Sequence, residues 1–198
     1  MYQQRKIDRD VFRAYDIRGT VGQQLDENAF YSVGKALACR LSELDRTSIL
    51  IGRDGRLSSY KLAQALTQGL LDSGINVFEL GEVTSPIMYY ATHISGVDSG
   101  VMVTGSHNPS DYNGIKMVLA GTTLAHDDIQ ILYDLIEQGV EKVGHGRLEI
   151  LDVVDDYVQR IVSDVRLARP LKVVVDAGNG IAGPIAPRVL RALGCEVV

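Results

Sequence analysis

The residues with the clearest chemical potential lie in one short polar stretch, TGSHNPSDYNGIK, at positions 104–116. This stretch holds Ser106, His107, Asn108 and Lys116, and it follows a short apolar run that is typical of a buried strand. Open α/β sheets place their ligands beyond the carboxyl ends of strands. We therefore expect Ser106 to lie exposed at the apex of a rigid loop, where it suits a nucleophile or a phosphate acceptor. A plain polar hairpin loop is the alternative.

A serine hydrolase is the obvious competing interpretation, since Ser106 and His107 are neighbours. The base of a hydrolase must come within about 2.6–3.2 Å of the serine hydroxyl, whereas neighbouring side chains of extended backbone point to opposite faces. No G-x-S-x-G elbow surrounds the serine. We therefore expect His107 to bind substrate or a phosphate oxygen instead.

A second polar cluster, FRAYDIRG at residues 12–19, precedes the first predicted helix. Arg18 stands beside a glycine, and its planar guanidinium could reach a phosphate. Arg13 and Tyr15 could assist it. A solvated N-terminal loop is the plain alternative.

A third cluster, GRDGRLSS at residues 52–59, follows a predicted strand. We expect Asp54 and Arg56 to form turn and ion-pair contacts, and Ser58 or Ser59 to cap the next helix. This interpretation is purely structural.

A glycine-rich turn, GNGIAG at residues 178–183, matches the G-x-G-x-x-G pattern of dinucleotide sites. Such a site also needs an acidic residue about 20 positions further on, at or beyond the end of this chain. We therefore expect a structural turn, and an unrelated oxidoreductase remains an alternative. The other histidines, at positions 93, 126 and 145, lack metal-ligand spacing, so we expect them on the surface. Cys39 and Cys195 show no metal or disulfide spacing, so we expect buried free thiols.

Strands and helices alternate along the chain, which predicts a three-layer α/β/α domain with a mixed, mainly parallel sheet. The predicted helices cover residues 28–44, 58–73, a short stretch from Thr84, 127–138, 155–165 and 184–193, and Asp26 is the candidate cap of the first helix. The predicted strands cover residues 48–51, 75–80, 100–103, 115–119, 171–175 and 195–198. An eleven-residue loop from Thr104 to Gly114, ending in an Asn113-Gly114 turn, joins the third and fourth strands without a helix. These two strands are therefore expected to be antiparallel.

Residues 48–81 and 172–198 repeat one pattern of strand, acidic and glycine turn, helix, glycine stop and strand, with Gly74 matching Gly194. The first copy lies inside a finished unit, whereas the second ends where another strand begins. We expect a fragment made of one complete domain, residues 1–150, followed by a connecting helix and the incomplete start of a second domain, residues 151–198.

The composition fits a soluble globular protein, with 45% hydrophobic and 23% charged residues among 198. The net charge of −5 argues against a nucleic-acid partner, and no apolar run reaches the roughly 18 residues of a membrane span. The first dozen residues lack the apolar segment of a signal peptide. We expect a cytoplasmic location and no membrane association.

The stretch TGSHNPSDYNGIKMV closely resembles the active-site serine loop of the α-D-phosphohexomutases, in the form typical of bacterial phosphomannomutase/phosphoglucomutase. The resemblance continues through FRAYDIRG, GRDGRLSS, the Ser-Pro helix and VVVDAGNGIAG, and so covers essentially the whole chain. The family has four domains, of which the first three are duplicated α/β units. The resemblance implies an enzyme that interconverts hexose 1-phosphate and 6-phosphate, with mannose or glucose as the sugar.

The resemblance also implies roles for residues that match family positions. Ser106 would be a phosphoserine that forms a bound hexose 1,6-bisphosphate and takes back its other phosphate. Mg²⁺ would bind through phosphorylated Ser106 and an Asp-rich loop that is absent from this chain. The implied catalytic residues are Ser106, Lys116 as acid/base, Arg18 and His107, and the implied substrate-binding residues are Tyr15, Asn108 and, less closely matched, Arg13.

The resemblance further implies a monomer whose missing C-terminal domains complete the site, so this piece alone is expected to be inactive. Two other hypotheses stay open. One is a stand-alone phosphosugar-binding or regulatory protein. The other is a phosphoglucosamine mutase, although such relatives usually carry alanine where Gly105 stands.

Overall fold

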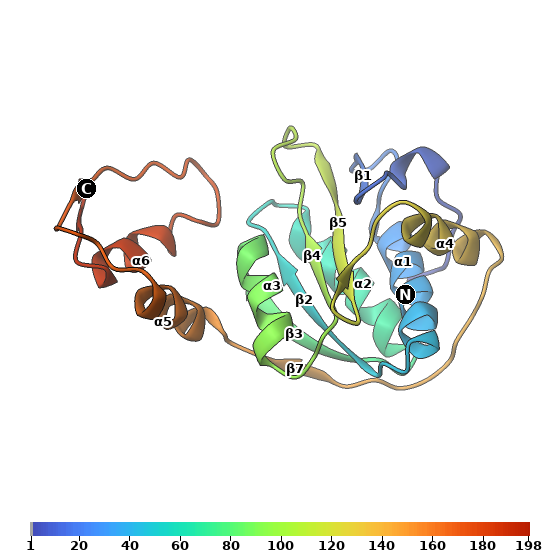
Figure 1. The fold of residues 1–198 in the computed structure, drawn as a ribbon. Coiled ribbons are helices and arrows are strands. Elements are labelled where there is room, and N and C mark those ends of the chain that lie inside the picture. The colour runs from blue at the N-terminus through green and yellow to red at the C-terminus, as the bar shows by residue number, and fades with distance from the viewer. Residues whose placement is uncertain (1) are drawn as a thin grey trace.

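The computed structural model describes residues 2–198 and contains one large and one small sheet (Figure 1). The strands of the large sheet are β1 (Ile17–Thr20), β2 (Ser48–Arg53), β3 (Asn76–Glu82), β4 (Gly100–Val103), β5 (Tyr112–Leu119), β6 (Thr122–Thr123) and β7 (Leu148–Ile150). Their order is β1-β5-β4-β2-β3-β7, with β6 beside β5. Strand β5 runs antiparallel to β4 and β1, whereas β2 is parallel to β3 and β4. The predicted mixed sheet and its antiparallel pair are confirmed.

Helices cover both faces of this sheet, which confirms the predicted three layers. The helices are α1 (Glu27–Glu43), α2 (Ser59–Leu71), α3 (Ser85–Ile94) and α4 (Asp127–Glu137), after a short 3-10 helix, η1 (Arg9–Val11). Successive side chains of a strand point to opposite faces. Accordingly, Ile49 and Ile51 of β2 pack in one core with residues of α1 and α2, whereas Leu50 packs in another with residues of α3.

The predicted turn at Asn113-Gly114 is wrong, because both residues lie within β5 and pair with β1. The loop between β4 and β5 therefore covers only residues 104–111. Asn113 is fully buried, and its side-chain amide donates hydrogen bonds to Ser58 Oγ and Ser59 Oγ at 2.8 and 2.9 Å. These long-range bonds and the close approach of β1 override the local turn preference of Asn-Gly.

The two predicted helix caps differ in outcome. Asp26 caps α1 as predicted, since its carboxylate accepts a hydrogen bond from the Ala29 N–H at 2.7 Å. Ser58 occupies the N-cap position of α2 without a side-chain capping bond. Its hydroxyl accepts from Asn113 instead, and the hydroxyl of Ser59 donates to Asp54 at 2.5 Å. The predicted serine cap is therefore wrong, because a tertiary contact uses both hydroxyls.

The C-terminal residues form a smaller unit that lies on the α3 side of the large sheet (Figure 1). It contains α5 (Val154–Asp164), β8 (Lys172–Val173), α6 (Ala186–Ala192) and β9 (Glu196–Val197), and its two strands are parallel. The parallel pair β2–β3 with α2 has the same strand-helix-strand architecture. Gly74 and Gly194 both follow the helix with positive φ, +82° and +87°, which is the backbone conformation that favours glycine at this position.

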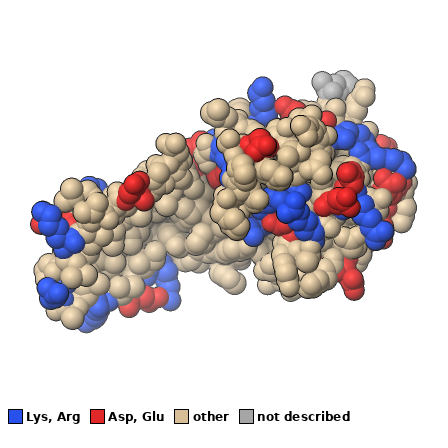
Figure 2. Space-filling view, turned by 90° about the horizontal axis from the view of Figure 1, so that it is seen from above, with Lys and Arg blue, Asp and Glu red and all other residues tan. Residues whose placement is uncertain are grey.

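The expectations for the two cysteines and for the three remaining histidines are confirmed. Cys39 and Cys195 are buried free thiols, and the three histidines outside the serine loop, at positions 93, 126 and 145, are exposed. None of the helices in residues 2–198 combines the length and apolar character that a membrane span requires. Lys and Arg are interspersed with Asp and Glu on the face seen in Figure 2.

Candidate active site

The loop after β4 presents Ser106 at the apex of a tight turn, as predicted. The turn is closed by a hydrogen bond from the Asn108 N–H to the Gly105 carbonyl at 3.1 Å, and the Asn108 side chain donates to the same carbonyl. The Ser106 N–H donates to Thr104 Oγ1 at 2.9 Å, and the serine side chain is exposed. Its φ of +53° lies in the left-handed region that residues with a side chain rarely adopt. Surrounding contacts must therefore hold this conformation.

The premise that the side chains of Ser106 and His107 point to opposite faces is wrong. Ser106 Oγ lies 3.3 Å from His107 Nδ1. The rule that neighbouring side chains diverge applies to extended backbone, whereas Ser106 has a positive φ that turns the two side chains to the same side. His107 can therefore share a hydrogen bond with the serine hydroxyl or with a group attached to it.

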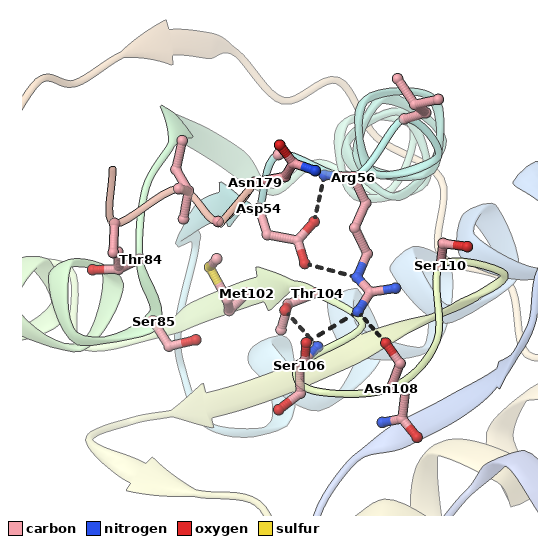
Figure 3. A pocket seen from close by; sticks show the side chains of 15 residues that line it. Asp54, Arg56, Thr84, Ser85, Met102, Thr104, Ser106, Asn108, Ser110 and Asn179 are labelled. Atoms are coloured by element: carbon pink, nitrogen blue, oxygen red, sulfur yellow. Dashed lines mark hydrogen bonds and ion pairs between the residues drawn. The ribbon is translucent and has the colours of Figure 1, made fainter. Parts of the chain in front are cut away.

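Ser106 borders a cleft of about 720 Å³ (Figure 3). The cleft is lined by four segments: the turn after β2, the start of α3, the serine loop and the glycine-rich turn before α6. Asp54 and Arg56 come from the first segment, Thr84 and Ser85 from the second, and Asn179 from the fourth. The cleft thus lies between the large sheet and the C-terminal unit. It has room for a small polar molecule of sugar phosphate size.

Arg18 lies at the base of the serine loop and is almost fully buried, with 2% of its surface exposed. Its Nη1 donates to the Thr104 carbonyl at 2.8 Å, and its Nη2 donates to Asp16 Oδ2 at 2.6 Å. Its Nε is buried without a hydrogen-bond partner in residues 2–198. The whole guanidinium is thus enclosed by the fold. The solvated-loop alternative is therefore wrong for this residue.

Lys116 lies on β5 directly opposite Met102 of β4. Opposite residues of an antiparallel pair project from the same face of the sheet, and Met102 lines the cleft. The Lys116 ammonium makes no ion pair or hydrogen bond with any residue that the structure describes. It therefore lies on the same face of the sheet as the cleft but does not itself line the cleft.

Tyr15 and Arg13 are exposed in the segment before β1. The ring of Tyr15 packs edge-on against His126, with 5.0 Å between the ring centroids. The His126 N–H donates to the Ala14 carbonyl at 2.7 Å and so ties this segment to the start of α4. Within residues 2–198, neither Tyr15 nor Arg13 makes a polar contact with Ser106. Arg18 is therefore the residue of this cluster that the fold brings to the serine loop.

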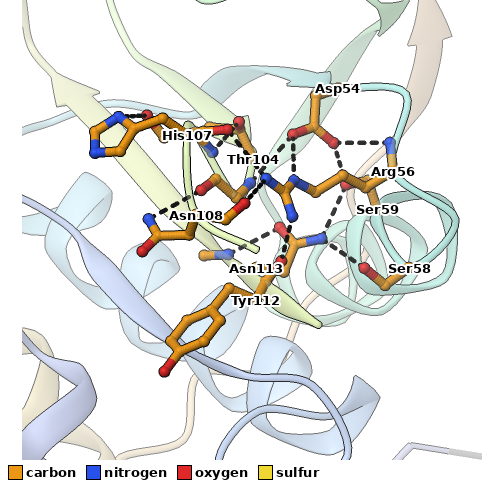
Figure 4. A network of polar contacts seen from close by, with 12 residues as sticks. Asp54, Arg56, Ser58, Ser59, Thr104, His107, Asn108, Tyr112 and Asn113 are labelled. Atoms are coloured by element: carbon orange, nitrogen blue, oxygen red, sulfur yellow. Dashed lines mark hydrogen bonds and ion pairs between the residues drawn. The ribbon is translucent and has the colours of Figure 1, made fainter. Parts of the chain in front are cut away.

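Asp54 and Arg56 belong to the site, which the sequence did not reveal (Figure 4). They form the expected ion pair, with 3.4 Å between Arg56 Nε and Asp54 Oδ2. Beyond that pair, the Arg56 guanidinium donates to carbonyls of the serine loop, and Asp54 accepts from the Gly105 N–H at 3.1 Å. One signal in the sequence could have indicated their place in the site. The GRDGR stretch follows one predicted strand as the serine loop follows another, and neighbouring parallel strands such as β2 and β4 end at the same edge of a sheet.

The described residues do not by themselves fit a magnesium site. Magnesium requires an octahedral set of oxygen ligands, usually including carboxylates. No group of three or more His, Cys, Asp or Glu side chains converges anywhere in residues 2–198. A phosphate on Ser106 would offer one ligand group, and the others would have to come from outside these residues.

Comparison with known proteins identifies the class of this chain. The family described as "Phosphoglucomutase/phosphomannomutase, alpha/beta/alpha domain I" matches residues 9–142. The chain therefore belongs to the phosphoglucomutase/phosphomannomutase family, and the resemblance drawn from its motifs is confirmed.

Individual relatives support the same assignment. The chain is 48% identical over 188 residues to phosphomannomutase/phosphoglucomutase of Pseudomonas putida, across 95% of this chain and 41% of the relative. It is 46% identical over 193 residues to phosphoglucomutase of Neisseria meningitidis serogroup B, across 96% and 42%. The chain thus spans about two fifths of the length of these curated relatives.

Solved structures confirm the fold. A phosphoglucomutase/phosphomannomutase family protein from Burkholderia thailandensis superimposes with a TM-score of 0.93 at 47% identity, across 97% of this chain and 44% of that one. A structure from Thermus thermophilus superimposes with a TM-score of 0.81 at 22% identity, across 99% and 46%. The second likeness shows the fold alone.

Proposed function

We propose that the protein to which this chain belongs interconverts hexose 1-phosphate and 6-phosphate, with mannose or glucose as the sugar and Ser106 as the phosphoryl carrier. The observation that carries the proposal is the exposed Ser106 at the apex of a fixed turn, facing a cleft and backed by a buried arginine. The family relatives, whose names specify phosphomannomutase and phosphoglucomutase, support the same reaction.

In the proposed reaction, phosphorylated Ser106 transfers its phosphoryl group to a free hydroxyl of the bound sugar phosphate. The bond between phosphorus and Ser106 Oγ breaks, a bond between phosphorus and the sugar oxygen forms, and the sugar hydroxyl loses its proton. The resulting hexose 1,6-bisphosphate turns over in the cleft and returns its other phosphoryl group to Ser106. The sugar oxygen then regains a proton, so that the cycle balances.

Residues of this chain have distinct proposed parts in these steps. Lys116, which is free on the cleft side of β5, accepts the proton of the sugar hydroxyl and returns it. Arg18 places its positive charge behind the serine loop, where it favours a phosphoryl group on Ser106, and His107 donates to the group on the serine oxygen that it contacts. The proposed substrate-binding residues are Asn108, which lines the cleft, and the exposed Tyr15 and Arg13.

Magnesium belongs to the proposal as the ion that would neutralise phosphoryl charge when bound. Its ligands would include phosphorylated Ser106 and groups outside this chain, since the described residues hold no further ligand cluster. We also propose that residues 1–150 form a first domain and residues 151–198 the start of a second. On this proposal the missing domains complete the site, and the 198-residue chain alone has no appreciable mutase activity.

The test is a Ser106→Ala substitution in the complete protein that carries this chain. A coupled assay should show loss of turnover, and the intact mass should lack the phosphoryl group that the wild type acquires from glucose 1,6-bisphosphate. Ser110→Ala is the matched control, because Ser110 is exposed in the same loop and lines the same cleft. Unchanged turnover in Ser106→Ala would contradict the phosphoserine assignment.

A further inference from the structure

The Arg56 guanidinium lies at the centre of the serine loop and binds its backbone at four points (Figure 4). Its Nη2 donates to the carbonyls of Ser106 and Asn108, at 3.0 and 2.6 Å. Its Nη1 donates to the carbonyls of Pro109 and Tyr112, at 2.6 and 3.1 Å. The bonds therefore span the loop from the serine itself to the first residue of β5.

Asp54 completes this arrangement from the same turn. One carboxylate oxygen accepts from the Gly105 N–H at 3.1 Å and lies 3.4 Å from Arg56 Nε. The other oxygen accepts from the Arg56 N–H at 3.1 Å. Both side chains are mostly shielded from water, with 15% exposed for Asp54 and 17% for Arg56. Charge-assisted hydrogen bonds in such surroundings are strong and directional.

The fit between the guanidinium and the loop is close. A Cβ atom at Gly105 would lie 2.2 Å from Arg56 Cζ and 2.3 Å from Nε, so the guanidinium packs directly against the loop backbone. A lysine could not reproduce these contacts, because an ammonium is a point charge with three donors and no planar fork. The four carbonyls require an arginine at this position.

We propose that Arg56 is a positioning residue that holds Ser106 in its reactive conformation. Ser106 has a φ of +53°, a conformation that persists only when neighbouring contacts impose it. Arg56 supplies those contacts through the carbonyl of the strained residue itself and three carbonyls that follow it. For its consequence in catalysis, this inference rests on the proposed function of Ser106.

The positioning role can be tested on the 198-residue chain without any enzymatic activity. Arg56→Ala should accelerate amide hydrogen exchange in residues 105–112 by roughly 10- to 100-fold, as expected for loss of hydrogen bonds to a charged group. Exchange in β2 and β4 should stay unchanged. Arg53→Ala is the matched control, because Arg53 ends the strand β2 that precedes the Arg56 turn but pairs with Glu82.

Two further measurements separate positioning from a general loss of structure. Added guanidinium ion, well below denaturing concentrations, should restore slow exchange in Arg56→Ala, whereas Arg56→Lys should remain fast. In the complete protein, Arg56→Ala should lower kcat by roughly 100-fold with little change in KM, because small misplacements of a reacting group cost rate. Guanidinium should recover part of that kcat.

The outcomes distinguish this inference from the proposed function. Wild-type exchange in the Arg56→Ala loop, or phosphorylation of Ser106 at the wild-type rate, would overturn the positioning role. If the loop loosens as expected but wild-type Ser106 takes no phosphoryl group from glucose 1,6-bisphosphate, the positioning role stands and the proposed function fails.

Discussion

Gly114→Ala is the substitution that most directly tests the packing behind the serine loop. Gly114 lies on β5 opposite Arg18 of β1. A Cβ atom there would lie 2.0 Å from the Ile17 carbonyl oxygen and 3.2 Å from the Arg18 Cα. Both neighbours are backbone atoms, so no side-chain rotation can relieve the contact.

The size of the effect follows from these distances. An ordinary carbon–oxygen contact is about 3.3 Å, so β1 and β5 would have to separate locally by about 1.3 Å. Such a shift lengthens a ladder hydrogen bond of about 2.9 Å beyond its useful range. We expect the free energy of unfolding to fall by about 2–4 kcal/mol, from overpacking and weakened strand pairing.

Urea unfolding of the 198-residue chain measures this change, and hydrogen exchange in residues 17–20 shows whether β1 loosens. Gly55→Ala is the matched control, because nothing lies within 4 Å of a Cβ at that glycine and its φ is not positive. That control should stay within about 0.5 kcal/mol of the wild type. A Gly114→Ala chain as stable as the Gly55→Ala chain would refute the reasoning.

Other predictions concern the ends of helices and the acid dependence of stability. Asp26→Ala should lower the free energy of unfolding by about 1 kcal/mol through loss of its hydrogen bond to the Ala29 N–H, whereas Thr84→Ala, at an N-cap without a side-chain bond, should cost less than about 0.5 kcal/mol; equal losses would contradict the capping role. The Arg46 guanidinium donates hydrogen bonds to Asp98 and holds the pKa of that carboxyl below its usual 3.8. This contribution is present above the ordinary pKa and is lost as pH falls through the lower folded-state pKa. Asp98→Asn should therefore have a lower free energy of unfolding in urea than the wild type at about pH 7, and the two values should converge in strong acid. An equal difference at both pH values would count against the ion pair.

Local patterns in the sequence were sufficient for the main elements of the fold. Alternating strands and helices, the Asp26 cap and the glycine stops depend on a few neighbouring residues, and the structure bears them out. Strands β6, β7 and β1 were not predicted from the sequence. In β1, the four residues stand beside polar side chains and include a buried arginine. Its place at the sheet edge depends on pairing with β5, almost 100 positions further along the chain.

The same distinction applies to the candidate site. The sequence by itself determined that Ser106 follows a strand in a short polar loop, and its motifs identified the family. Only the tertiary structure showed that Ser106 and His107 approach each other and that Arg56 binds the loop. When only neighbouring residues are considered, Asn-Gly favours a turn, and Asp-Gly-Arg favours an ion pair within its own turn. In the folded chain, hydrogen bonds between β2, β5 and their loops join residues about 50 positions apart, and those bonds decide which local preference survives.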